Sequence, residues 1–186
     1  LESYVNLNTQ PISEGMAVQA MKMIATNLRF AVANGSNLEA RANMLLASTI
    51  AAMAFNSTRL GLAHALALPL GAHFRIPHGL VNAILLPEVM RYNLIGNTAK
   101  FAEIAAIFGE RVEHLSVHEA AERSVEAVRR LNRDIGITQT LGDFGVGEEH
   151  LEMIANEAME SGNVPVNPVK ATAKDLIGIC RRLLGD

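Results

Sequence analysis

Residues 61–79, GLAHALALPLGAHFRIPHG, place three of the chain's six histidines, His64, His73 and His78, in an apolar run that favours helix. Burying an imidazole costs free energy unless its ring nitrogens find partners. A lone histidine in such a run is more often a packed core residue than a ligand. Three of them in nineteen residues raise the question of a shared site, which the rest of the sequence has to answer.

Length and composition favour one domain over residues 1–186. The chain is 49% hydrophobic, which provides enough apolar side chains for one sizeable core. The formal net charge is −3 and the basic residues are scattered, so we expect neither nucleic acid nor an anionic membrane as the main partner. The single cysteine, Cys180, excludes an internal disulfide framework and indicates a cytoplasmic protein.

We expect neither a signal peptide nor a membrane span. The opening LESYVNLNTQ is polar and lacks the layout of a leader. Residues 42–58 carry no charge, but they are rich in alanine and interrupted by polar side chains, which favours a helix buried on most sides within the protein. Because the chain starts on Leu1 and LESYVN resembles the interior of a sequence, we expect it to be part of a longer protein.

Helical periodicity runs through almost the whole chain, and no segment alternates cleanly at period two. It predicts an all-α bundle of about seven to nine helices. Capping residues mark the expected helix starts. Ser13 begins a helix that runs to Ala33, and Asn37 begins the next. Asn97 or Thr98 begins a helix that Gly109 ends, Ser116 begins one in a capping box with Glu119, and the last begins near Thr172. Near the C-terminus, the prolines of residues 161–171 predict an extended linker.

Regularly spaced apolar residues in four predicted helices indicate which face of each helix is buried. They are Phe101, Ile104, Ala105 and Phe108; Val117, Ala121, Val125, Val128 and Leu131; Leu151, Ile154, Ala155 and Ala158; and Leu176, Ile177, Cys180, Leu183 and Leu184.

Several common catalytic signatures are absent from the sequence. There is no GxGxxG nucleotide loop and no GxSxG nucleophile elbow. Cys180 falls on the buried stripe of the last helix, so we do not expect it to act as a nucleophile. His114, His118 and His150 lie among charged residues on amphipathic segments, and we expect them at the surface.

His64 and His78 are the candidate pair for a site. We expect Pro69 to break or kink the first helix and Pro77-His78 to begin a new one. Two packed helices can bring both imidazoles to one divalent metal. A spacing of fourteen residues is weak evidence by itself, so a simple core-packing role stays open, and His73 is expected to point elsewhere.

The run NSTRLGLAHALALPLGAHFRIPHGLVNAILLPEVMRYN, residues 56–93, strongly resembles the second signature of the iron-containing (group III) alcohol dehydrogenases. The similarity has no gaps through GLAHA, PLG, PHG and NAILLPEVMRYN. Looser agreement in AMKMIATNLRFAV, FAEIAAIFG and NPVKAT extends it over essentially the whole chain.

The resemblance implies a domain organisation and a metal site. In that family an N-terminal α/β domain binds NAD(P), and an all-helical C-terminal domain holds a divalent iron through one Asp and three His. His64 and His78 match the last two histidine ligands. LESYV resembles the chain just after the first histidine, so the resemblance implies that the Asp and that histidine precede Leu1.

Cofactors and partners follow from the same resemblance. It implies Fe2+ or Zn2+ together with NAD(P), a small alcohol or aldehyde substrate, and a nucleotide-binding domain that this chain lacks. We expect the chain alone to bind metal weakly, to be inactive, and to form homo-oligomers through apolar surface that the other domain would cover.

Three positions in the motif carry specific expectations. Leu68 stands where many relatives have a histidine near the reacting carbon, so that role does not transfer to this chain and the pocket is expected to be more apolar. His73 stands where relatives have a bulky apolar or aromatic residue and is expected not to bind metal. Asn82 is expected either to orient the metal site or to be a helix-packing amide.

Two alternatives to the alcohol dehydrogenase hypothesis stay open. Glycerol dehydrogenase, dehydroquinate synthase and maleylacetate reductase share the helical domain and a similar arrangement of metal ligands, often with zinc or no metal. The other alternative is a non-enzymatic helical module in which His64 and His78 are merely packed.

Overall fold

A computed structural model of the chain describes residues 1–185, which form nine α-helices, three short 3-10 helices and no strand. The expectation of an all-α bundle of seven to nine helices is therefore confirmed. The α-helices are α1 Glu2–Val5, α2 Pro11–Ala33, α3 Leu38–Thr58, α4 Leu62–Phe74, α5 His78–Asn93, α6 Thr98–Ile107, α7 Val117–Asp134, α8 Leu151–Met159 and α9 Ala173–Arg181. The 3-10 helices are Leu94–Gly96, Gly142–Phe144 and Glu148–His150.

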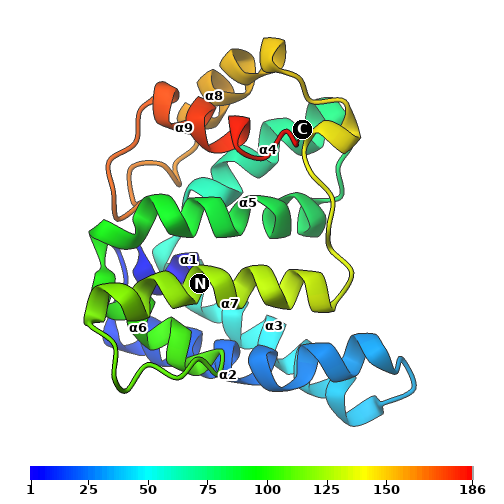
Figure 1. The fold of residues 1–186 in the computed structure, drawn as a ribbon, viewed down its shortest axis with the longest axis vertical. Coiled ribbons are helices and arrows are strands. Elements are labelled where there is room, and N and C mark those ends of the chain that lie inside the picture. The colour runs from blue at the N-terminus through cyan, green and yellow to red at the C-terminus, as the bar shows by residue number, and fades with distance from the viewer. Residues whose placement is uncertain (186) are drawn as a thin grey trace.

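The helices form two groups on either side of a central pair (Figure 1). Helices α5 and α7 run side by side across the middle, with α4, α8 and α9 packed on the α5 side. Helices α1, α2, α3 and α6 lie on the α7 side, and the far ends of α2 and α3 extend beyond the rest of the molecule. Each group has its own apolar cluster. We call the cluster of α4, α5, α8 and α9 the first core. The second core is the cluster of α1, α2, α3, α6 and α7, to which α5 also contributes Met90.

Most of the expected caps are present. Asn37 Oδ1 accepts a hydrogen bond from Ala40 N at 3.0 Å, and Ser116 forms its capping box with Glu119. Thr172 caps α9. The expected start at Ser13 is wrong, because α2 already begins at Pro11. A proline fits the first helical position well, since its fixed φ suits the helix and its missing N–H would have had no partner there.

Pro69 does not break α4. The helix runs from Leu62 to Phe74 with Pro69 inside it. A proline in a helix interior costs about 3 kcal/mol. Both Leu66 and Leu70 are fully buried in the first core, and α4 packs against α5 and α8. Tertiary packing on both sides of Pro69 therefore keeps the helix continuous.

The prediction that residues 42–58 are buried on most sides is wrong. In α3 the buried apolar residues are Ala40, Ala47 and Ala54, which are seven residues apart and form one narrow stripe. Leu45 and Met53 are exposed large side chains on the same helix, because α2 is the main helix packed against α3. No helix within residues 1–185 is both long enough and apolar enough to cross a membrane.

The other buried faces follow the predicted spacing with few exceptions. Phe101 and Ile104 of α6 are buried, and a left-handed Gly109 follows the helix. Val117, the first residue of α7, is exposed instead of buried. Helix α9 buries Ile179, while the expected Ile177, Leu183 and Leu184 are only partly buried. Phe108, just after α6, is also only partly buried.

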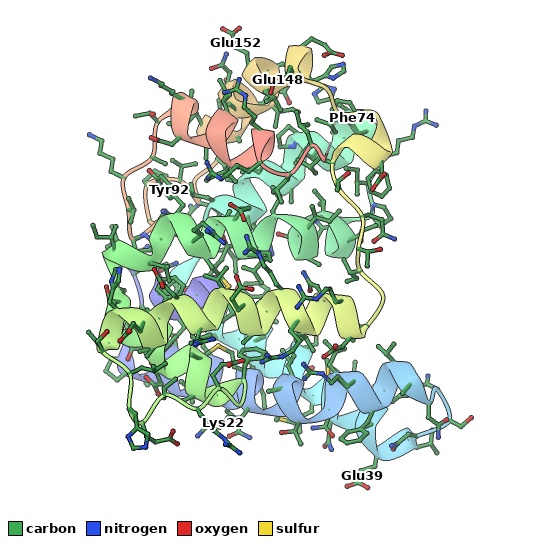
Figure 2. The ribbon with its side chains drawn as sticks, in the orientation of Figure 1. Lys22, Glu39, Phe74, Tyr92, Glu148 and Glu152 are labelled. Carbon is green, nitrogen blue, oxygen red and sulfur yellow. The ribbon has the colours of Figure 1, made fainter. Side chains whose placement is uncertain are left out.

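The segment 161–171 is not an extended linker. It forms a series of turns, closed by hydrogen bonds from Val164 N to Ser161 O and from Asn167 N to Val164 O. Tyr92 of α5 donates to Lys170 O at 2.9 Å, and Figure 2 shows Tyr92 where α5 meets this segment. Its prolines exclude helix but do not keep the chain straight.

Candidate metal centre

His64 and His78 lie next to each other in the structure. Their ring centroids are 5.5 Å apart, with the planes at 62°. The connection between α4 and α5 explains how two residues fourteen positions apart meet. Arg75 adopts a left-handed conformation at φ 54°, and the carbonyl oxygen of Ile76 lies 3.5 Å from where a Cβ on Gly71 would stand. The connection thus folds back along α4, and α5 begins beside the earlier turns of that helix.

Glu2 completes this arrangement, and the sequence interpretation missed it. Its Oε2 lies 2.5 Å from His64 Nδ1, while its Oε1 accepts a hydrogen bond from Ala63 N at 2.7 Å. The carboxylate is only 6% exposed. Helix α4 has Gly61 at its N-cap and hence no capping side chain of its own, so Glu2 supplies the missing acceptor from α1. No local spacing could have revealed a contact between residues 61 positions apart.

Gly61 is required for this contact. A Cβ built on Gly61 would lie 2.7 Å from Glu2 Oε1 and 3.2 Å from Asn167 Oδ1. Atoms in real structures do not approach so closely without displacement. The glycine therefore makes room for the buried carboxylate at the start of α4, and it is the one sequence signal that could have pointed to a close partner there.

Helix α1 is a single turn, but several long-range contacts hold it in place. Asn6 is buried, and its Nδ2 donates to the carbonyl oxygens of Thr58, Arg59 and Leu60 at 2.9, 3.2 and 3.1 Å. These three residues connect α3 to α4. Asn6 thereby fixes the turn that carries Glu2 to the backbone just before α4.

Tyr4 and Lys100 hold the other side of α1. Tyr4 donates to Glu103, and Lys100 Nζ donates to Tyr4 O at 2.7 Å and to Glu14 at 2.6 Å. Burial, followed by the neighbouring Glu103 carboxylate, raises the pKa of Tyr4 well above its usual value, so the phenol keeps its proton. Glu2 therefore projects from a fixed support.

Asn82 lies one helical turn after His78 and contacts its ring. Asn82 Nδ2 donates to His78 O at 2.9 Å and lies 3.2 Å from His78 Nε2. Its Oδ1 is buried and has no hydrogen-bond partner within the described residues. Buried polar atoms without partners are uncommon. The orphaned oxygen beside the imidazoles is therefore an acceptor available to a polar group bound there.

A cavity of about 310 Å3 adjoins His64, the first imidazole of the pair. His64 and Asn82 lie on its wall, and most of the remaining lining is apolar. Its main apolar residues are Leu1, Met21, Ile24, Phe55, Leu86, Phe108, Val128 and Leu131. An apolar cavity with a few convergent polar groups is the usual form of a small-molecule or partner site.

The donor set fits part of a metal centre. The carboxylate of Glu2 occupies His64 Nδ1, which leaves Nε2 of that ring for a metal, and carboxylate–histidine–metal arrangements are common in proteins. Imidazole nitrogens are suitable ligands for divalent iron or zinc. Within residues 1–185, however, no group of three or more His, Cys, Asp or Glu side chains could hold a metal ion. The described chain thus offers two imidazoles and no complete set.

The other histidines lie away from this pair. His73 Nε2 is 2.9 Å from Glu157 of α8, and both side chains are well exposed. His118 is exposed, and so is His114, which lies in a turn and not on a helix. His150 was expected at the surface but is half-buried, because its Nδ1 accepts from Gly147 N and its ring packs edge-on against Phe74.

The structure also locates Cys180 and Leu68. Cys180 is buried in the first core, and burial raises the pKa of its thiol to about 12, so little thiolate is available for nucleophilic attack. Leu68 is 58% exposed one helical turn after His64. It is not among the residues that line the cavity beside His64.

The chain is similar in sequence and in fold to known alcohol dehydrogenases. Residues 1–184 match the sequence profile described as Fe-containing alcohol dehydrogenase family, C-terminal. The chain is 47% identical to a 1,3-propanediol dehydrogenase of Klebsiella pneumoniae over 182 residues, which cover 98% of this chain and 47% of that protein. It is 39% identical to an NAD-dependent methanol dehydrogenase of Bacillus methanolicus, with 99% and 48% covered.

Among solved structures, that of 1,3-propanediol oxidoreductase superposes with a TM-score of 0.96 at 46% identity, covering 98% of this chain and 48% of that one. The chain spans about half the length of the relatives it matches.

Proposed function

This chain belongs to the Fe-containing alcohol dehydrogenase family, and we propose that it is the metal-binding helical domain, residues 1–186, of an NAD(P)-linked alcohol dehydrogenase or aldehyde reductase. The observation that carries this proposal is the convergence of His64 and His78, with ring centroids 5.5 Å apart beside an apolar cavity.

His64 and His78 are two ligands of a divalent metal in this proposal. The residues that precede Leu1 supply the remaining ligands. Glu2 contacts His64 directly, so the chain just before it enters the structure next to the imidazole pair. Two ligands alone hold a metal far more weakly than a full set, and the isolated chain is accordingly expected to bind weakly and to be inactive.

The metal is Fe2+, with Zn2+ as the alternative, and the second cofactor is NAD(P). When bound, such an ion supplies Lewis acidity that polarises the oxygen of an alcohol or aldehyde. The nicotinamide carries the hydride. A relative that is 39% identical is named as NAD-dependent, which supports a nicotinamide as the cofactor.

The residues of this chain position the metal and surround it with apolar side chains that exclude water. His64 and His78 hold the metal beside the cavity, and Asn82, whose Nδ2 donates to His78 O, packs next to the His78 ring. Leu68 presents an apolar surface where water would otherwise approach the pair, and we expect it to favour the alkyl part of a small alcohol.

The partner in this proposal is a nucleotide-binding domain that closes the cleft over the imidazole pair. Exposed apolar side chains of α3, such as Leu45 and Met53, give such a domain or a second copy of the chain a surface to cover, which supports a homo-oligomeric assembly.

The test uses the whole protein that contains this chain, loaded with Fe2+ and assayed for NAD(P)-linked oxidation of short alcohols. We expect activity that is lost in His78→Ala and kept in His73→Ala, since His73 pairs with an exposed Glu157 away from the site. Metal analysis of the same preparation distinguishes iron from zinc. Absence of both bound metal and activity with any short alcohol or aldehyde would refute the proposal.

A further inference from the structure

We propose that Glu2 is a positioning residue, which holds His64 in the tautomer that leaves Nε2 free to bind a metal. An ionised carboxylate only accepts hydrogen bonds. Glu2 Oε2 lies 2.5 Å from His64 Nδ1. In this proposal Nδ1 donates to that oxygen, and the lone pair of the ring stays on Nε2. This role rests on the proposed function, because it matters only if His64 is a ligand.

The two oxygens of Glu2 have separate tasks. Oε1 accepts from Ala63 N at 2.7 Å, while Oε2 faces the imidazole of His64 and lies 3.4 Å from its backbone N. One side chain thereby fixes the first turn of α4 and the ring that this turn carries. The Ala63 N–H group can only donate a hydrogen bond, so it fixes the orientation of the Glu2 carboxylate.

The surrounding residues show that this carboxylate is held in place. It is 6% exposed. Asn6 ties α1 to the backbone just before α4, and Gly61 leaves the space that the carboxylate fills. A carboxylate with only a packing role would need neither two donors nor a glycine beside it.

Glu2→Gln isolates the positioning role, since the amide has nearly the same shape but only one acceptor oxygen. Ala63 N–H can only donate, so the Gln oxygen takes its place there and the NH2 group faces His64. Nδ1 must then accept a hydrogen bond. The ring proton leaves Nδ1 and, through exchange with water, rebinds at Nε2, which removes the lone pair that a metal needs.

The control is Glu157→Gln, which makes the same chemical change beside His73, an imidazole at the other end of α4. It should leave the His64 ring and metal affinity unchanged. A second variant, Gly61→Ala, displaces the Glu2 carboxylate without altering it, because the new Cβ would lie 2.7 Å from Oε1.

The experiment records long-range 1H–15N spectra of the metal-free chain, labelled with 15N-histidine, above pH ~9, where free imidazoles are neutral. Spectra of His64→Ala assign the ring, and circular dichroism verifies that each variant is folded. We expect Nδ1–H for His64 in the unmodified chain and Nε2–H in Glu2→Gln, with the Nδ1–H signature also lost in Gly61→Ala. Titration of the whole protein that contains this chain with Zn2+ should show about 10- to 100-fold weaker binding in Glu2→Gln and no change in Glu157→Gln.

Retention of the Nδ1–H signature in either folded variant would overturn the role of Glu2, as would unchanged Zn2+ affinity in Glu2→Gln. The tautomer is read without metal or cofactor, so its outcome is separate from that of the activity test. An inactive whole protein with the expected tautomer change would refute the dehydrogenase function alone.

Discussion

Helix α4 contributes the histidine of two histidine–carboxylate pairs, one near each end of the helix. The pairs differ in their burial and in the number of donors to the carboxylate. His64 Nδ1 lies 2.5 Å from Glu2, with side chains 30% and 6% exposed. His73 Nε2 lies 2.9 Å from Glu157, with side chains 40% and 46% exposed. The first carboxylate also accepts from a backbone N–H group, whereas the second is nearly half exposed. The Glu2–His64 pair is therefore distinguished from the Glu157–His73 surface pair by its burial and its additional donor, and not by the type of residues in it.

Metal binding should separate the two pairs most strongly. We expect His64→Ala to weaken Zn2+ binding by more than the about 10- to 100-fold that loss of an outer-shell partner costs, because it removes a ligand. His73→Ala should leave the affinity unchanged, since its imidazole lies in the other pair. Isothermal titration of the two variants makes the comparison, and equal losses would contradict the assignment of His64 as a ligand.

Loss of the carboxylates should have unequal effects on stability. Glu2→Ala removes an acceptor from buried Ala63 N and from the His64 ring, so we expect about 2–4 kcal/mol lower free energy of unfolding. Glu157→Ala breaks an exposed pair and should cost less than about 1 kcal/mol. Urea unfolding followed by circular dichroism measures both. Similar losses would show that burial does not distinguish the pairs.

The glycines near the two pairs provide the smallest contrast. Gly61→Ala should lower stability by about 1–3 kcal/mol, because its Cβ meets the Glu2 carboxylate at 2.7 Å. Gly71 lies inside α4, where a Cβ would be at an ordinary 3.5 Å from Ile76 O, so Gly71→Ala should raise stability by about 0.5–1 kcal/mol. Opposite signs in thermal melts support the crowding at Gly61, and equal signs would refute it.

The sequence predicted the features that depend on local periodicity and capping. The helical class, the Asn37, Ser116 and Thr172 caps and the buried stripe of α6 are confirmed, because each is set by residues three or four positions apart. The motif in residues 56–93 indicated the family through residue identities that no propensity explains.

Features set by distant contacts could not be predicted in this way. Pro69 was expected to break or kink a helix, and packing on both sides keeps that helix continuous. The uncharged residues 42–58 do not reveal whether the faces of α3 are covered. Glu2 was missed because its partners lie 61 and 62 positions away, and only the fold brings them together.

The position of the imidazole pair has a consequence for cooperativity. His64 and His78 belong to α4 and α5 of the first core, whereas Glu2 projects from α1, whose Tyr4 and Val5 pack in the second core. A cation shared by these imidazoles and by residues just ahead of α1 would tie the two halves of the bundle together. We therefore expect the loaded protein to melt in one transition, and removal of the ion by a chelator to lower that melting temperature for the whole bundle.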